Sequence, residues 1–383
     1  MKRIISFFTV LLLLTGCWDR IEIEERGFVV GAAIDSEKEN KILLTQQLIN
    51  PKAMNGSSSS QGGEGGNKSY LNVKETGDSV FEIVRGVATN SSRTPYYGHT
   101  KVIVISSDIA ESDKMAETLD YFIRNPVMRR STILAISRGK ATDILDVKPK
   151  IENAPAMYIK SISENNYKNA EILPKVRLGD VHEYLLSNKS FVITMIERNK
   201  EKLDLSGVAI MHGKTNTMVG TLNRDETVAL NYVTNEIDGG FIKTFHEEKP
   251  ILYDIYNFHS DVEVQASDKN NISFTIKIRT EGGLAETFLS RDYLNVETFT
   301  AFEETIEKEI LQKSTEAVER AQNEYKVDYL NLGEYLRQNN YKLWNEIKDD
   351  WDSGENYFSS AKIDFDVQVR VRTTGSVNKS KNE

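Results

Sequence analysis

The residue whose type and position most clearly indicate chemistry is Cys17, the only cysteine in the 383-residue sequence. It follows Leu14, Thr15 and Gly16, and small residues before a cysteine let an extended chain enter the narrow site of a lipoprotein signal peptidase. In that reaction the thiol takes a diacylglyceryl group through a thioether, and cleavage leaves the cysteine first in the mature chain. We therefore predict a signal peptide over residues 1–16, lipid attachment at Cys17, and peptidase recognition through the three residues before it.

The segment before Cys17 has the charge and the length of an export signal. Lys2 and Arg3 are followed by an apolar run from Ile4 to Leu14. A helix needs about 20 apolar residues to cross a bilayer, so this run is too short to span one and matches a secretory signal. Two acyl chains, at about 0.8 kcal/mol per buried methylene, give stable anchoring. We expect a protein anchored to the outer face of a cytoplasmic membrane; the alternative is an ordinary signal peptide with a chance cysteine.

The composition narrows the class of protein. With 39% hydrophobic residues the chain can form cores for two or three domains. The formal net charge of −9 argues against nucleic-acid binding, which needs basic surfaces, and against attachment to anionic lipid by charge. No second apolar run approaches membrane-spanning length. Because the one cysteine carries lipid, we expect no disulfide, so packing alone must stabilise the fold.

Catalytic and metal-binding patterns are missing from the sequence. It contains no HExxH pair, no CxxC pair, no GxSxG elbow and no P-loop. The acidic pair Glu303-Glu304 falls on the charged face of a predicted helix, where we expect it to be solvated. We therefore predict no catalytic residue, no metal site, no enzymatic activity and no cofactor beyond the covalent diacylglycerol. The histidines are scattered along the chain, at His99, His182, His212, His246 and His259.

The N-terminal half of the mature chain has the pattern of a mixed α/β domain. Residues 101–106 and 131–137 are continuous apolar runs, typical of strands buried on both faces, and a helical pattern over 109–123 lies between them. This order predicts a parallel βαβ unit. Residues 55–67 are almost entirely Gly and Ser, so we expect a flexible loop at the tip of a long hairpin. We assign residues 17–189 to this domain, as one unit or two subdomains.

At about residue 190 the pattern changes to hairpins followed by a long helix. Alternating apolar residues predict an antiparallel hairpin over 262–278 and a half-buried strand over 363–372. Apolar residues three or four apart predict the longest helix over 296–328. We expect residues 190–375 to form an α+β domain, an antiparallel sheet packed by that helix. A polar tail follows over 376–383, and further strands are predicted over 191–196, 203–211 and 217–222.

Several short segments of the sequence occur together in a combination that is specific for one protein family. Trp18-Asp19 and a Glu-rich turn directly follow the lipid site, and Gly98-His99 stands directly before a buried strand. Together with matching segments elsewhere, these resemble the Ger(x)C family, the lipoprotein C subunits of spore germinant receptors. The resemblance covers nearly the whole chain, through Cys17–Glu25, Val29–Asp35, Tyr97–Val104, Leu119–Asn125, Gly207–Ile210, Val219–Leu222, Trp344, Trp351 and the strand that ends before Gly375.

The resemblance implies both a function and a fold. It implies a subunit of a receptor that senses small nutrients, beside two integral-membrane subunits, A and B, in the inner membrane of dormant endospores. It also implies several mixed α/β domains and no enzymatic activity, which agrees with the reading from the residues.

The residues just after the lipid site are candidates for contact with those membrane subunits: Trp18, Asp19, Arg20 and Glu22. At about 3.5 Å per residue, Glu22 stands no more than roughly 18 Å from the acylated cysteine. An indole at that height can supply apolar contact and a hydrogen-bond donor to a partner. The alternative is that Trp18 sits in the lipid headgroup layer, as interfacial tryptophans do.

Two other functions compete with the receptor subunit. One is a solute-binding lipoprotein of a transport system, and the other is a surface hydrolase. Solute-binding proteins usually have two repeated α/β lobes around a cleft, whereas the two halves predicted here differ in kind. A hydrolase lacks its catalytic residues in this sequence. Copurification of membrane subunits favours the receptor, and binding of amino acids or sugars by the isolated domain favours solute binding.

Overall fold

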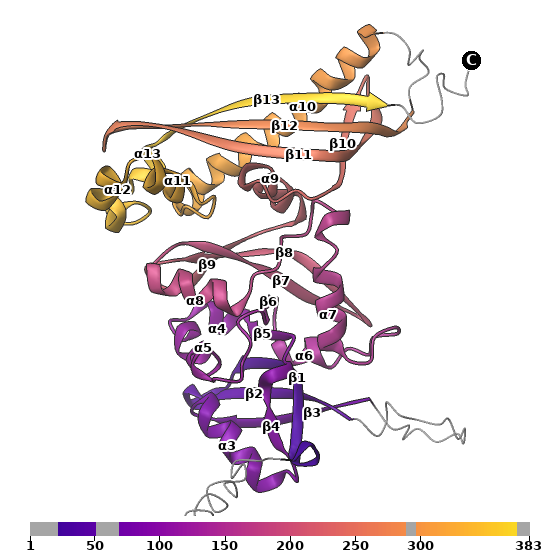
Figure 1. The fold of residues 1–383 in the computed structure, drawn as a ribbon, viewed down its shortest axis with the longest axis vertical. Coiled ribbons are helices and arrows are strands. Elements are labelled where there is room, and N and C mark those ends of the chain that lie inside the picture. Colours follow the sequence, from indigo (N-terminus) through magenta and orange to yellow (C-terminus); the bar gives the residue numbers. More distant parts are fainter. Residues whose placement is uncertain (1–21, 51–68, 289–295, 374–383) are drawn as a thin grey trace, which may run out of the picture.

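The computed structural model describes residues 22–50, 69–288 and 296–373. Figure 1 shows two β-sheets stacked along the long axis, with the start of the described chain at one end and the second sheet at the other. Helices cover both sheets, so the mixed α+β, multidomain fold predicted from the sequence is confirmed.

The first sheet, here called the N-terminal sheet, has nine strands in the order β3-β2-β1-β5-β6-β7-β8-β9, with β4 beside β1. Strands β1, β5, β6 and β7 are parallel neighbours, and antiparallel hairpins extend the sheet on both sides. The expected parallel pairing of the two buried runs is confirmed. The strands are β1 (Arg26–Ser36), β2 (Ile42–Ile49), β3 (Tyr70–Gly77), β4 (Thr94–Tyr96), β5 (Val102–Ser106), β6 (Ile133–Ser137), β7 (Phe191–Asn199), β8 (Lys202–His212) and β9 (Thr217–Leu222).

Helices lie on both faces of the N-terminal sheet, which explains its continuous apolar runs. In β5, Ile103 and Ile105 face one core, while Val102 and Val104 face the other. The first core is covered by α3 (Val80–Asn90), α4 (Ser107–Glu111), α5 (Met115–Arg124) and α8 (Leu178–Ser187), and the second by α6 (Ala141–Leu145) and α7 (Pro155–Ser163). Short 3-10 turns are η1 (Ile23–Glu25), η2 (Lys38–Asn40), η3 (Tyr97–His99) and η4 (Asn166–Lys168).

The predicted helix over 109–123 is wrong as a single element, because the chain breaks at Ser112 between α4 and α5. The Ser112 hydroxyl donates to the carbonyl of Ile109 at 2.8 Å and accepts from the Lys114 N–H at 3.3 Å. A serine side chain that bonds the nearby backbone competes with the helical hydrogen bonds. The predicted hairpin of β2 and β3 is confirmed, and its Gly/Ser tip at 55–67 lies outside the described residues.

The strands after Ser190, which we assigned to the C-terminal domain, pair with the N-terminal sheet. Strand β7 lies parallel to β6, with Met195 beside Ile136, and β8 and β9 continue from it as antiparallel hairpins. Strand β8 contributes to three cores: Ala209 and Met211 face the first core of the N-terminal sheet, Leu203 faces the second, and Val208 and Ile210 pack with the elements of the second sheet. The sheet therefore continues past the expected boundary at residues 189–190.

The second sheet, here called the C-terminal sheet, has the order β10-β11-β12-β13. The hairpin of β11 and β12 is antiparallel and packs against the long helix, as predicted. Strand β10, which was not predicted, adds antiparallel to β11, and β13 adds in parallel to β12. A parallel neighbour needs a crossover connection, which the long helix and the helices after it supply. The elements are α9 (Arg224–Thr234), β10 (Gly240–His246), β11 (Lys249–Asp268), β12 (Asn271–Thr287), α10 (Val296–Glu319) and β13 (Lys362–Thr373).

The long helix ends earlier than predicted and in a different form. After Glu319 the chain enters one π-helical stretch, η5 (Arg320–Tyr325), and Lys326 then takes a left-handed conformation with φ of 56°. Single π-helical turns are rare and occur frequently at functional sites. The chain continues through α11 (Leu332–Asn339), α12 (Tyr341–Ile347), the 3-10 turn η6 (Lys348–Asp350) and α13 (Tyr357–Ser360).

Candidate functional site

The residues predicted to carry lipid or contact a partner lie at the start of the chain, and only Glu22 is among the described residues. Its side chain is exposed, and its carbonyl accepts a hydrogen bond from the Glu25 N–H at 3.1 Å. It therefore begins the short turn η1 that leads into β1. The others lie outside the described residues: Leu14, Thr15, Gly16, Cys17, Trp18, Asp19 and Arg20.

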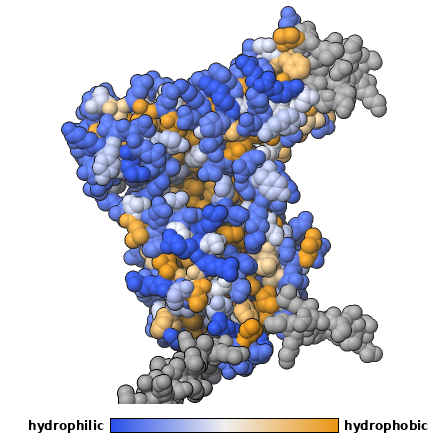
Figure 2. Space-filling view, viewed as in Figure 1, coloured by the Kyte–Doolittle hydropathy of each residue, from blue (hydrophilic) through white to orange (hydrophobic). Residues whose placement is uncertain are grey.

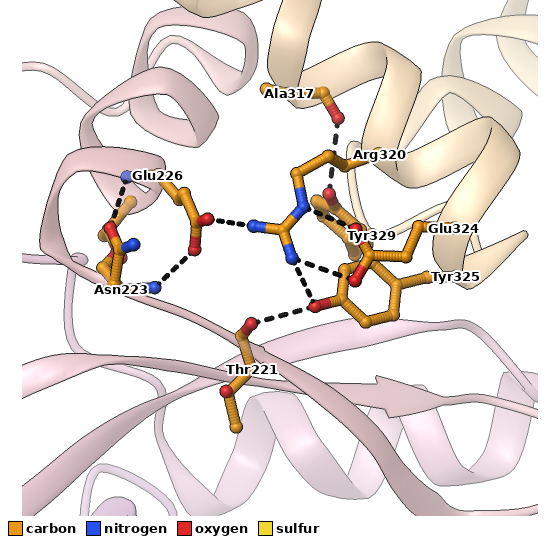
Figure 3. Close-up of polar contacts among 9 residues, drawn as sticks. Thr221, Asn223, Glu226, Ala317, Arg320, Glu324, Tyr325 and Tyr329 are labelled. Atoms are coloured by element: carbon orange, nitrogen blue, oxygen red, sulfur yellow. Dashed lines mark hydrogen bonds and ion pairs between the residues drawn. The ribbon is translucent and has the colours of Figure 1, made fainter.

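A polar cluster lies where the two sheets meet, and its centre is Arg320 in η5 (Figure 3). The Arg320 guanidinium pairs with Glu324 through two contacts of 2.7 and 3.0 Å and donates to the Tyr325 hydroxyl at 2.8 Å. Its remaining nitrogen pairs with Glu226 of α9. The hydrogen bonds from Arg320 hold the pKa of Glu324 below its usual range.

Local sequence positions the partners of Arg320. Glu226 sits at the third position of α9, where Asn223 caps the helix: the Glu226 N–H donates to Asn223 Oδ1 at 3.0 Å, and the Asn223 N–H donates to Glu226 Oε2 at 2.7 Å. Tyr325 donates to the carbonyl of Thr221, at the end of β9, at 3.0 Å. Its ring lies against Gly220, where a Cβ would overlap the ring. The cluster therefore joins α9, η5 and the last strand of the N-terminal sheet.

A second polar connection joins the sheets through Ser190. Its hydroxyl accepts from the Gly213 N–H at 3.0 Å and donates to Asp352 Oδ2 at 2.5 Å. The same carboxylate oxygen accepts from the Asp328 N–H at 3.2 Å. One continuous path of hydrogen bonds thus runs from the turn after β8 to the loop after η5.

Asp328 itself is a buried carboxylate at this junction. It accepts hydrogen bonds from the N–H groups of Leu332 and Gly333, at 3.0 and 2.6 Å, and from the Trp351 indole at 2.7 Å. Burial nevertheless raises the pKa of Asp328, because the desolvation of the charged form outweighs the three donors. The carboxylate organises the loop between η5 and α11.

A cleft of about 780 Å³ opens beside Asp328, between α8 and the helices α11 and α12. Lys189 lines it with its ammonium over the Tyr184 ring, 5.5 Å from the ring centre, and desolvation lowers the pKa of this lysine. On the opposite wall, hydrogen bonds from Arg337 lower the pKa of Glu334 to about 2. The cleft is therefore polar, with charges of both signs.

The polar side chains between the two sheets are arranged to hold the fold rigid rather than to carry out a reaction. Each carboxylate named above is engaged by N–H, hydroxyl or guanidinium donors. Within the described ranges, no group of three or more His, Cys, Asp and Glu side chains could hold a metal ion. No helix of the described chain is long and apolar enough to cross a membrane.

These junction residues were not predicted from the sequence. The capping box Asn223-x-x-Glu226 was a readable signal for the start of α9. Nothing local marks Arg320, Asp328 or Lys189, because their partners come from elements far away in the sequence. They depend on how the two sheets pack.

Comparison with known proteins decides the family. The family description "Spore germination protein N-terminal domain" matches residues 19–198, and "Spore germination B3/ GerAC like, C-terminal" matches residues 206–375. The chain belongs to this spore germination family. Its members are C subunits of germinant receptors, which are receptor components and not enzymes, so the resemblance drawn from the sequence is confirmed.

Relatives and a solved structure agree over nearly the full length. The chain is similar to spore germination protein YndF of Bacillus subtilis, with 32% identity over 96% of this chain and 95% of that protein. It is 28% identical to spore germination protein B3 of the same organism, over 97% of each chain. Its fold is similar to the crystal structure of the GerBC protein, with a TM-score of 0.63 and 24% identity over 92% of this chain and all of that one.

Proposed function

We propose that this chain is the lipid-anchored, non-enzymatic subunit of a spore nutrient germinant receptor, and that it acts through contacts with integral-membrane subunits A and B to trigger germination. The observation that carries the proposal is the match to the spore germination family over residues 19–198 and 206–375. The similar proteins are named spore germination proteins, and the family is that of receptor C subunits.

The mode of attachment is argued from Cys17. It is the only cysteine, it follows Leu14-Thr15-Gly16, and an apolar run of signal length precedes it. A diacylglyceryl group on Cys17, with palmitate among its acyl chains, holds the protein on the outer face of the cytoplasmic membrane, which in the spore is the inner membrane. Trp18, Asp19, Arg20 and Glu22 then stand within reach of the outer loops of the membrane subunits.

The test combines anchoring and partner recovery in spore-forming cells. Cys17→Ala is expected to abolish labelling by palmitate and to release the chain from the membrane fraction, while Ser6→Ala, within the apolar run, leaves both unchanged. Trp18→Ala is expected to lower recovery of the membrane subunits in pull-downs without lowering the amount of lipidated protein. Label retained by Cys17→Ala would refute the anchor, and a failure of the unaltered chain to recover any membrane subunit would refute the receptor role.

A further inference from the structure

The described chain begins close to the proposed lipid site. Glu22 is its first residue, and five residues connect Glu22 to Cys17. Those five residues span at most about 18 Å, so the surface around Glu22 stands within that distance of the bilayer. In Figure 1 this end of the molecule carries α3 and β4, whereas β10 and the rest of the C-terminal sheet lie at the opposite end. The surface nearest the bilayer is therefore at the end that carries α3 and β4.

Arginine and tyrosine side chains gather at this end, where β1 pairs with β4. Phe28 of β1 lies beside Tyr96 of β4 in the register of the two strands. The Arg26 guanidinium lies over the Tyr96 ring, 4.4 Å from its centre. Arg93, which directly precedes β4, packs against β1, since a Cβ added to Gly27 would stand 3.5 Å from the Arg93 Cβ. Both arginines therefore lie at the start of the first strand.

The basal surface is defined here as Ile23, Arg26, Arg93 and Tyr96. Ile23 is apolar and 69% exposed. Among the described residues, neither arginine has a carboxylate within ion-pair distance, and the Tyr96 hydroxyl forms no hydrogen bond with the protein. Figure 2 shows apolar residues among hydrophilic ones at this end of the molecule. Such a mixture suits the boundary between a bilayer and water, where side chains with an apolar body and a polar tip are favoured.

Charges of both signs lie at this end, because Glu22, Glu24 and Glu25 are exposed on either side of Ile23. A purely anionic or purely cationic partner would be repelled by one of the two sets. A zwitterionic phospholipid such as phosphatidylethanolamine carries a phosphate, which a guanidinium binds through two parallel hydrogen bonds, and an ammonium, which pairs with a carboxylate. The headgroup layer of a bilayer therefore complements both the arginines and the glutamates.

We infer that the basal surface rests in the phospholipid headgroup layer, so that the molecule stands upright on the membrane with the C-terminal sheet furthest from it. The inference rests on the proposed function, because lipid attachment at Cys17 sets the distance to the bilayer. Arg26 and Arg93 bind lipid phosphates, and Ile23 enters the apolar boundary. These contacts and the short connection to the anchor together fix the orientation.

Fluorescence quenching by lipid tests this orientation. If Cys17 is lipidated, an introduced cysteine is the only free thiol, so the full lipidated chain can carry one bimane label in vesicles of phosphatidylethanolamine and phosphatidylglycerol. Ser92→Cys, at an exposed residue beside Arg93, is expected to lose most of its fluorescence when the vesicles contain lipids with a spin-labelled headgroup. Phe245→Cys in β10, at a side chain that is 59% exposed, is the matched control and is expected to lose none.

Labels on the two flanks distinguish a standing molecule from a lying one. Leu186 of α8 and Tyr167, just after α7, are 74% and 54% exposed, and these two helices cover opposite faces of the N-terminal sheet. Leu186→Cys and Tyr167→Cys are expected to keep their fluorescence. Quenching at either flank as strong as at Ser92, or no quenching at Ser92 in a chain that stays with the vesicles, would overturn the inference while leaving the anchor standing. A chain that does not stay with the vesicles would overturn the proposed anchor and this inference with it.

Charge reversal tests the arginine contacts. In the Ser92→Cys chain, combining Arg26→Glu with Arg93→Glu is expected to abolish the quenching, whereas Arg26→Lys with Arg93→Lys keeps the charges and is expected to retain it. Arg124→Glu, at an exposed arginine of α5, is the control and is expected to leave it unchanged. Quenching that survives the double reversal would overturn the role of the arginines.

Cross-linking identifies what covers the basal surface in the native setting. On intact spore membranes, a photoactivatable probe on Ser92→Cys is expected to give products with lipid. A product that joins this position to a membrane protein would show that a protein covers the surface, and would overturn the inference while leaving the proposed function standing.

Discussion

Glu303 of α10 accepts a hydrogen bond from the backbone N–H of Val371, at 2.9 Å, on the edge strand β13. One turn further along the helix, Glu307 accepts from the Val369 N–H at 3.0 Å. The helix thus satisfies two groups that an edge strand otherwise exposes to pairing with another chain. Our expectation that Glu303 is merely solvated is wrong, because its side chain is only 17% exposed and also pairs with Arg370. Its neighbour Glu304 is exposed.

Removing the Glu303 carboxylate should lower the stability of the fold. Glu303→Ala leaves the Val371 N–H without its acceptor, and the free energy of unfolding is expected to fall by about 1–3 kcal/mol. Urea unfolding of the chain from Trp18 onward measures the change. Glu304→Ala, one residue along the same helix but exposed, is the control and should change stability by no more than about 0.5 kcal/mol. Equal effects from the two variants would contradict the capping role.

Arg320 should contribute far more to stability than an exposed arginine. Arg320→Ala leaves Glu226, Glu324 and Tyr325 without their shared donor, so we expect a loss of about 1–3 kcal/mol in the free energy of unfolding. Arg124→Ala removes only an exposed pair with Asp120 within α5 and should cost no more than about 0.5 kcal/mol. Denaturant midpoints compare the two, and a loss for Arg320→Ala as small as that for Arg124→Ala would show that the cluster does not hold the sheets together.

Because of Asp328, the free energy of unfolding should depend on pH. Burial raises its pKa above the ordinary value near 3.9, so this group contributes most to stability below that value and the contribution is lost as the pH rises through the raised pKa. Asp328→Asn cannot titrate there. The stability of the wild-type protein relative to this variant should therefore shrink or reverse as the pH rises from about 4 to 7. Urea unfolding at a series of pH values measures it, and a difference that grows with pH would contradict the assignment.

Substitution by alanine should lower the stability at one glycine and raise it at another. Gly220 lies under the Tyr325 ring, and Gly220→Ala places a methyl well inside van der Waals contact with the ring carbons, so we expect a loss of about 1–3 kcal/mol from overpacking. Gly86 lies inside α3, and a methyl added there would meet no atom within 4 Å, so Gly86→Ala should gain about 0.5–1 kcal/mol of helix stability. Thermal melting distinguishes them, and a stabilised Gly220→Ala would show that Tyr325 does not pack as described.

The sequence predicted the positions of strands better than it predicted which strands pair with one another. The alternation over 363–372 correctly indicated which residues of β13 face the core, because that pattern is local. This alternation carries no information on whether a strand runs parallel or antiparallel to its neighbour, so the parallel pairing of β13 with β12 was missed. The hairpins after Ser190 were found as strands, but their pairing with β6 depends on a contact between Ile136 and Met195, far apart in sequence.

The candidate sites show the same limit. A lipid site at Cys17 can be proposed from the sequence because recognition by a lipoprotein signal peptidase would depend on the residues directly before it, and it stays a prediction. The strand β10 was missed, and with it the close approach of His246 to Thr305 of α10, at 2.9 Å. Arg320 could not be found from its neighbours, since the position of Glu226 relative to it depends on two helices that meet only in the folded chain.

Strand β8, which contributes to the cores of both sheets, sets an order for folding during synthesis. The chain is made from its N-terminal end, so that part can begin to fold first. Until Leu222 has emerged, the N-terminal sheet lacks part of its last hairpin, and β7 or β8 keeps an unpaired edge open to association with other chains. Even then the side chains of Val208 and Ile210 stay exposed until the C-terminal elements that bury them have folded. The two halves therefore reach their final packing together, and a chain truncated between them would leave both vulnerable to proteolysis and aggregation.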